Sequence, residues 1–148
     1  MFSVQGRKNF LRTDFRPELF KYMAGIMKNC GQYPLAVNGY CDHVHLFFEL
    51  KPDNSVSEII RIVKSNSSKW MNEQNFVDGK FNWQAGHGSF TYAKSQRDTV
   101  IKYLMNQEIH HQQKSFREEY LKMLVEYSID YNNAYLFEFY DDVNDIFL

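Results

Sequence analysis

Two stretches of the chain place apolar residues at three- and four-residue spacing, the period of an amphipathic helix. The first runs from about Arg16 to Asn29, and Gly31 follows it where a glycine commonly ends a helix. The second runs from a capping-box pattern at Ser55 and Glu58 to about residue 73. We therefore expect two helices, each with one buried face.

Other segments have the pattern of strands and of further helices. Strands are predicted at residues 34–41 and 43–51, while residues 80–93 predict a glycine-bent loop that feeds another strand. A third helix is expected from a cap at residues 95–98 through about Gln112, and a fourth over residues 116–127. With a first strand at the amino terminus, this order predicts an α+β fold in which helices cover one face of an antiparallel sheet.

Length and composition narrow the class of protein. The 148 residues fit one domain, residues 1–148. The longest apolar runs fall far below the ~18 residues of a membrane span, and no signal-peptide pattern follows Met1, so we expect a cytoplasmic protein. Cys30 and Cys41 have neither the spacing of a zinc site nor the density of a disulfide scaffold, which predicts reduced, structural thiols.

The charge distribution allows two interpretations. A net charge of −1 argues against nonspecific wrapping of nucleic acid. Basic residues nevertheless predominate in the first 30 positions and acidic residues after residue 117. This asymmetry is typical of a solvated face and an acidic tail, but it also fits a DNA-binding protein if the fold gathers the bases on one side.

His43 and His45 are the first candidates for chemistry. Residues two apart in a strand point to the same face, so the two imidazoles project side by side while Val44 points to the opposite face. Two imidazoles so placed can bind one metal ion. The alternative is a pair of neutral rings that form hydrogen bonds at half-buried positions, and the tripeptide alone leaves both open.

Tyr103 and Gln107 are four residues apart in the predicted third helix and share a face. Gln107 offers an oxygen ligand of the kind that Mg²⁺ or Mn²⁺ prefers, and a metal bound to a phosphate would allow attack by a Tyr103 phenolate. Alternatively, they are an ordinary helix aromatic and a surface amide. His110 and His111 follow, where they could assist proton transfer or instead face solvent or DNA phosphate.

These residues lie in two of four segments that together form a wider pattern. The segments are Asn38-Gly39-Tyr40-Cys41-Asp42-His43-Val44-His45-Leu46, Lys64-Ser65-Asn66-Ser67-Ser68-Lys69-Trp70, residues 81–90 and residues 100–111. In this order the chain, over about residues 2–138, resembles the single-tyrosine HUH transposases of small bacterial insertion sequences and their relatives associated with repetitive extragenic palindromes.

The resemblance implies a metal-dependent endonuclease and strand transferase that acts on single-stranded DNA beside hairpins. It implies His43 and His45 as paired ligands of Mg²⁺ or Mn²⁺, Gln107 as the third protein ligand and Tyr103 as the nucleophile. The intermediate would be a 5′-phosphotyrosine, with a free 3′-hydroxyl on the other fragment, so rejoining would need no ATP. It also implies a ferredoxin-like, RRM-like sheet, a C-terminal helix carrying the nucleophile, and a homodimer in which Tyr103 acts in cis or in trans.

Two features depart from the family pattern. Residues 1–4 begin partway through the strand with which relatives start, so we expect a shortened first strand. His87 stands between two glycines where relatives often carry an aromatic residue, and we expect it to change loop packing or DNA stacking rather than to bind metal. Contacts with hairpin phosphates are expected from basic side chains, namely Arg7, Lys8, Arg12, Lys64 and Lys69.

The leading hypothesis is therefore an active transposase. The short first strand and the net acidity favour an alternative, a DNA-hairpin-binding protein of the same fold that has lost cleavage. A small sheet-and-helix protein with a metabolite pocket is the third hypothesis, because such folds host many functions. It leaves unexplained why two histidines, a tyrosine and a glutamine occur together.

Overall fold

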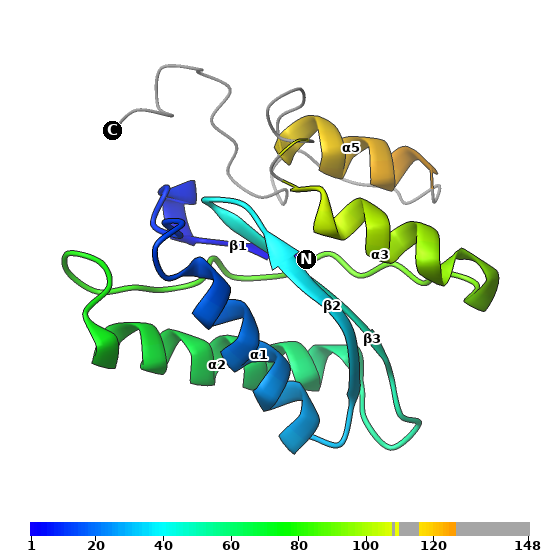
Figure 1. The fold of residues 1–148 in the computed structure, drawn as a ribbon, viewed down its shortest axis with the longest axis horizontal. Helices are drawn as coiled ribbons and strands as arrows, with labels where there is room; N and C mark the ends of the chain where they lie inside the picture. Colours follow the sequence, from blue (N-terminus) through cyan, green and yellow to red (C-terminus); the bar gives the residue numbers. More distant parts are fainter. Residues whose placement is uncertain (108, 110–115, 127–148) are drawn as a thin grey trace.

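The structure, a computed structural model, describes residues 1–107, 109 and 116–126. At the centre of this described part lies an antiparallel sheet in the order β1-β3-β2 (Figure 1). Its strands are β1 (Phe2–Ser3), β2 (Tyr33–Gly39) and β3 (His43–Glu49). The hairpin of β2 and β3 was predicted, with strands that end two residues earlier than expected.

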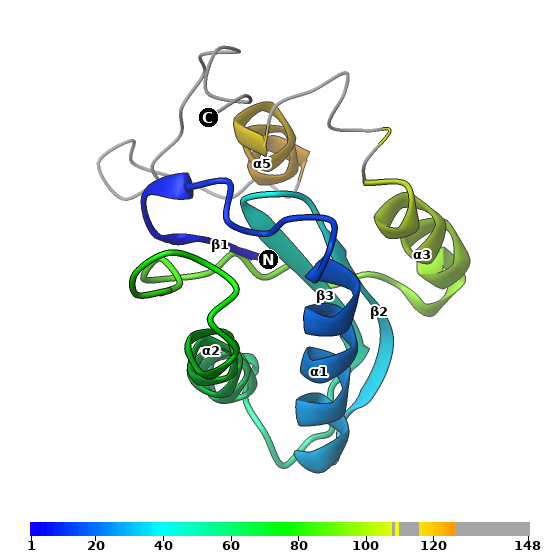
Figure 2. The ribbon, with the colours of Figure 1, turned by 60° about the vertical axis from the view of Figure 1, so that its left-hand side comes forward.

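Two helices cover one face of the sheet, as predicted. They are α1 (Arg16–Asn29) and α2 (Val56–Gln74), which lie together on that face (Figure 2). Their apolar stripes pack with Val44 of β3 and with Phe81 and Trp83 into a core of buried side chains. The Ser55 hydroxyl accepts a hydrogen bond from the Glu58 backbone amide at 3.1 Å, so the predicted cap of α2 is formed. Gly31 has a φ of +77°, which suits the turn that ends α1.

The segment predicted to bend and then form a strand, residues 80–93, is a loop with a single bridge between Val4 and Trp83. It runs beside β1. The Gln84 backbone N–H donates a hydrogen bond to the Ser3 carbonyl, and the Gly88 backbone N–H donates one to the Met1 carbonyl. The β-prone run that follows the two glycines forms no strand. The loop before it is held by the Lys64 ammonium, which donates hydrogen bonds to the carbonyls of Gln84 and Gly86 at 2.6 and 2.9 Å.

The remaining helices lie on the other side of the sheet. A 3-10 turn, η2 (Lys94–Gln96), leads into α3 (Arg97–Met105), and α5 spans Phe116–Glu126 (Figures 1 and 2). The Asn38 side chain of β2 donates a hydrogen bond to the Leu104 carbonyl of α3 at 2.8 Å. Helix α3 ends earlier than predicted, with Asn106 as its C-cap; residues 108 and 110–112 of the predicted third helix, and Tyr127, lie outside the described residues.

Two further observations concern chemistry and environment. Both cysteines are free thiols, in agreement with the prediction. In the described part of the chain, no helix combines the length and apolar character needed to cross a membrane.

Candidate active site

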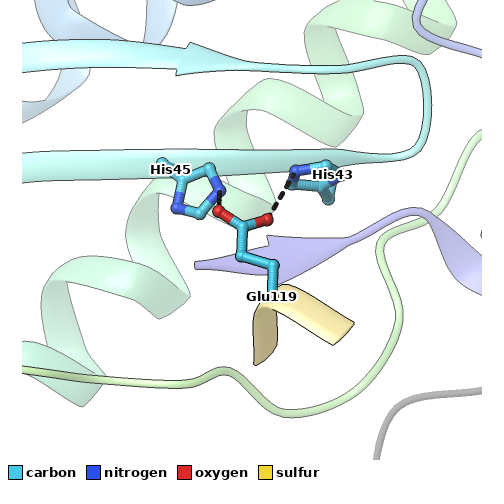
Figure 3. Close-up of side chains that lie close together, drawn as sticks. All are labelled: His43, His45 and Glu119. Carbon is cyan, nitrogen blue, oxygen red and sulfur yellow. Dashed lines mark ion pairs between the residues drawn. The ribbon is translucent and has the colours of Figure 1, made fainter. Parts of the chain in front are cut away.

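Strand β3 brings two histidines to one face of the sheet, as its alternation predicted. His43 and His45 are buried, with ring centroids 5.2 Å apart, and they face α5 (Figure 3). Val44 between them is buried in the opposite core. The tight turn before β3 requires Gly39, since a β-carbon there would lie 2.2 Å from the His43 carbonyl oxygen.

A buried ion pair orients the first of these rings. Asp42 accepts two hydrogen bonds from the Arg7 guanidinium, at 2.9 and 2.7 Å, and lies 2.7 Å from His43 Nδ1. Burial acts to raise the pKa of Asp42, but His43 and Arg7 outweigh it and hold that pKa well below its usual range. The ionised carboxylate therefore accepts a hydrogen bond from Nδ1–H of His43, and in this tautomer the Nε2 lone pair faces α5.

The group that faces both histidines is a carboxylate from α5. Glu119 is 3% exposed, and its oxygens lie 3.8 Å from His43 Nε2 and 3.4 Å from His45 Nε2 (Figure 3). Burial lowers the pKa of His45 to about 4, although Glu119 acts in the opposite direction. The His45 ring is therefore neutral near pH 7, so its approach to Glu119 is not a full ion pair.

Tyr103 of α3 reaches the same carboxylate. Its hydroxyl donates a hydrogen bond to Glu119 Oε1, so the tyrosine lies beside the histidines of its own chain. Burial and the negative charge of Glu119 raise the pKa of Tyr103, while a hydrogen bond with the Gln107 side chain lowers it. Gln107 is fully buried. The structure thus brings His43, His45 and Tyr103 together around Glu119, and Gln107 lies beside Tyr103.

The donor set fits a divalent metal ion. One ligand atom from each of His43, His45 and Glu119 lies within 4.8 Å of the others. Donor atoms around a single small ion lie roughly 3 to 4 Å apart when each bond is about 2.1 Å long. The observed 3.4 and 3.8 Å separations fall in that range. Two imidazoles with a carboxylate form a mixed nitrogen and oxygen set that suits Mn²⁺ or a related ion.

The other predicted residues are placed differently. Arg7 and Lys64 are half-buried and engaged inside the molecule, Arg7 with Asp42 and Lys64 with two loop carbonyls. The remaining predicted phosphate contacts, Lys8, Arg12 and Lys69, are exposed. His87 is half-buried, and burial lowers its pKa. His110 and His111 lie outside the described residues.

A cavity of about 550 Å³ opens beside His45 and Tyr103. Its walls come from β3, residues 88–94 and α3, and they carry the rings of Phe47, Phe90 and Tyr92. The Phe47 and Tyr92 rings meet edge to face, with centroids 6.1 Å apart. The volume is in the range of ordinary ligand sites, and the aromatic walls could accept unstacked bases.

Sequence reasoning missed Glu119. The only signal for it was its place in the predicted fourth helix, beside the apolar positions Tyr120 and Leu124, which are buried. Its place in that helix did not indicate which element the Glu119 side chain would contact.

Comparison with known proteins identifies a family model that matches this chain. A family model described as "Transposase IS200 like" matches residues 1–107, a segment that contains His43, His45, Tyr103 and Gln107 but ends before Glu119. The fold is similar to a crystal structure of a candidate transposase from Deinococcus radiodurans R1, with a TM-score of 0.57 and 19% identity. That match covers 72% of this chain and 85% of the other, and at this identity it shows a common fold. No curated protein sequence matches the chain significantly.

Proposed function

Because the chain belongs to the IS200-like transposase family, we propose that it cleaves and rejoins single-stranded DNA near hairpin ends, with Tyr103 as the nucleophile. The observation that carries this proposal is the position of the Tyr103 hydroxyl. It comes from a helix some sixty residues after the histidine pair, yet it bonds the carboxylate that also faces both histidines. Tyrosine, imidazoles and carboxylate converge on one buried point.

In the reaction we propose, the Tyr103 side chain is first the attacking group and later the leaving group. Tyr103 Oη attacks the scissile phosphorus, the bond from phosphorus to the 3′-oxygen breaks, and the 3′-oxygen leaves with a proton. The DNA is then attached through a 5′-phosphotyrosine, and attack by a 3′-hydroxyl reverses the step and releases Tyr103. The high pKa of Tyr103 means that its proton must be accepted as the attack occurs.

We propose that His43, His45 and Gln107 hold Mg²⁺ or Mn²⁺ in this reaction. A divalent ion there would withdraw charge from the phosphate and stabilise the leaving oxygen. Asp42 keeps the His43 ring in the orientation that such binding needs.

DNA is the partner that membership of a transposase family implies. We propose that the strand beside the scissile phosphate lies in the cavity next to His45, where Phe47 and Tyr92 would stack on unpaired bases. We also propose that the protein acts at the nucleoid as a homodimer, which light scattering of the purified protein would test.

The decisive experiment is adduct formation. Wild-type protein incubated with an end-labelled single-stranded hairpin and Mn²⁺ should give a covalent protein–DNA band, and Tyr103→Phe should abolish it. Tyr33→Phe is a matched control, because it removes a hydroxyl from an exposed tyrosine of β2 outside the cavity, and it should still form the adduct. An undiminished adduct in Tyr103→Phe would remove Tyr103 from its role. Hairpin affinity without any adduct would favour the inactive hairpin-binding alternative.

A further inference from the structure

We infer that Glu119 is an additional, charged ligand of the ion at His43 and His45, contributed by α5. The inference rests on the proposed function, because it concerns the ion proposed for that site. Glu119 lies outside the segment that the transposase family model matches, so it is a feature of this chain rather than one carried over from that match.

The geometry of the carboxylate supports ligation. Each oxygen faces a different histidine, Oε2 toward His43 and Oε1 toward His45, at 3.8 and 3.4 Å. Both distances are longer than a hydrogen bond to a charged group, and both fit two donors that share one ion. The His43 nitrogen that faces Glu119 is the one left without a proton when Nδ1 bonds Asp42.

Charge balance supports the same assignment. The other proposed ligands, two imidazoles and one amide, are uncharged donors, so an ion held by them alone would bring its full charge into a buried place. Glu119 is itself a buried carboxylate, and a divalent ion beside it would offset the cost of burying its charge. An ion between the three side chains removes both costs at once.

Packing of α5 fixes Glu119 in this position. Tyr120 and Leu124 are buried with Met1, and Tyr120 packs against Phe90 with ring centroids 6.3 Å apart. Gly88 leaves space for the Tyr120 ring, because a β-carbon there would lie 2.5 Å from it. The side chain next to this anchor, Glu119, is thereby directed at β3, whereas its neighbour Glu118 is exposed.

The test is metal binding by the full chain without DNA. Mn²⁺ alone is titrated into wild type, Glu119→Gln and Glu118→Gln by isothermal titration calorimetry, with a parallel thermal melt of each. We expect Glu119→Gln to raise the Kd by about tenfold or more, since even the loss of an outer partner of a metal ligand costs 10–100-fold. Glu118→Gln, a matched change one residue away, should bind as wild type does.

The melting temperatures of Glu119 variants distinguish a metal ligand from a residue with a merely structural role. Glu119→Gln removes a buried charge, so its melting temperature without metal should equal or exceed that of wild type, while its stabilisation by Mn²⁺ is lost. Glu119→Asp keeps the charge and should retain more affinity than Glu119→Gln; equal losses in the two would overturn the inference.

The inference and the proposed function fail differently. If wild type binds Mn²⁺ and forms the Tyr103 adduct while Glu119→Gln keeps the wild-type Kd, only the role of Glu119 is overturned. If wild type binds no Mn²⁺, both the metal site and its additional ligand are overturned.

Discussion

Asp42 is the residue on which the orientation of His43 depends. Replacing it with asparagine removes the charge that faces both the Arg7 guanidinium and His43 Nδ1. Breaking one side of a buried ion pair typically costs about 3–5 kcal/mol, so the free energy of unfolding of Asp42→Asn should fall by that order in urea titrations. Its Mn²⁺ Kd should rise about 10- to 100-fold, because the ring loses its orienting partner.

The control for Asp42→Asn is Asp14→Asn. Asp14 pairs with Arg12 at 3.1 Å, but both side chains are exposed. Exposed pairs contribute little, so neither the unfolding midpoint nor the Mn²⁺ Kd should change measurably. Equal behaviour of the two variants would show that burial of the Asp42 pair has no energetic consequence.

At the residue scale, sequence reasoning reached the site through periodicity. His43 and His45 are two apart in a strand, and Tyr103 and Gln107 are four apart in the predicted third helix, so each pair could be assigned to one face. Arg7 was expected to contact DNA phosphate, and the sequence did not reveal its pairing with Asp42, because a basic residue near the amino terminus suits DNA as well as it suits an internal carboxylate. Glu119 could not be assigned either, because it belongs to no local motif and its importance arises from packing between distant elements.

At the element scale, the docking of α5 depends on Gly88. In Gly88→Ala the new methyl group would meet the Tyr120 ring at 2.5 Å, so the ring and with it α5 must move. We expect a loss of about 1–3 kcal/mol in urea unfolding, the usual cost of overpacking. Mn²⁺ binding should weaken as well if Glu119 is a ligand.

The matched control for Gly88→Ala is Gly25→Ala. Gly25 lies within α1, and a β-carbon there meets nothing within 4 Å. Alanine is the better helix former, so this variant should gain about 0.5–1 kcal/mol. A Gly88→Ala protein as stable as wild type would show that α5 does not rely on this close contact.

A substitution of Phe47 tests whether single-stranded DNA binds in the cavity beside β3. If a base stacks there, Phe47→Ala should lose about 1–3 kcal/mol of single-strand affinity, roughly a 5- to 150-fold rise in Kd measured by fluorescence anisotropy. Tyr33→Ala is the control, because Tyr33 is an aromatic of β2 that is 59% exposed and does not line the cavity. Equal affinities for the two variants would place the DNA elsewhere.

Element prediction succeeded where the pattern was long and regular. The helix at residues 16–29 and the hairpin before residue 50 follow directly from their periodicity. Residues 80–93 were predicted to include a strand because they are β-prone. They form a loop without a strand. Two of the loop carbonyls, those of Gln84 and Gly86, bond the Lys64 side chain, which comes from a helix some twenty residues earlier and cannot be inferred from local pattern.

At the scale of the whole molecule, the α+β fold was predictable, but the layout of its layers was only partly so. Helices α1 and α2 follow from their single apolar faces, which must cover the sheet. That α3 and α5 meet on the other side depends on the contacts of Asn38 with Leu104 and of Tyr103 with Glu119. Both contacts join polar groups far apart in the chain, which periodicity does not reveal.

The stability of the whole molecule should depend on pH through His45. Its pKa is lowered to about 4 by burial, whereas an unfolded histidine titrates near 6.5. Between these values only the unfolded chain binds the proton, so this contribution is complete above about pH 6.5 and is lost as the pH falls toward 4. The shift corresponds to a free energy on the order of 3 kcal/mol.

Urea unfolding at several values between pH 7 and pH 4.5 would measure this contribution as the difference between wild type and His45→Gln. The buried amino group of Met1, whose pKa burial lowers to about 5, titrates in both proteins, so wild type and His45→Gln are compared over the same pH range. The free energy of unfolding of His45→Gln should therefore change less with pH than that of wild type. The two free energies should differ most at pH 7, because there the neutral imidazole contributes fully. Parallel curves would mean that His45 is protonated in the folded protein as readily as in the unfolded chain, and a ring so easily protonated would compete poorly for a metal ion.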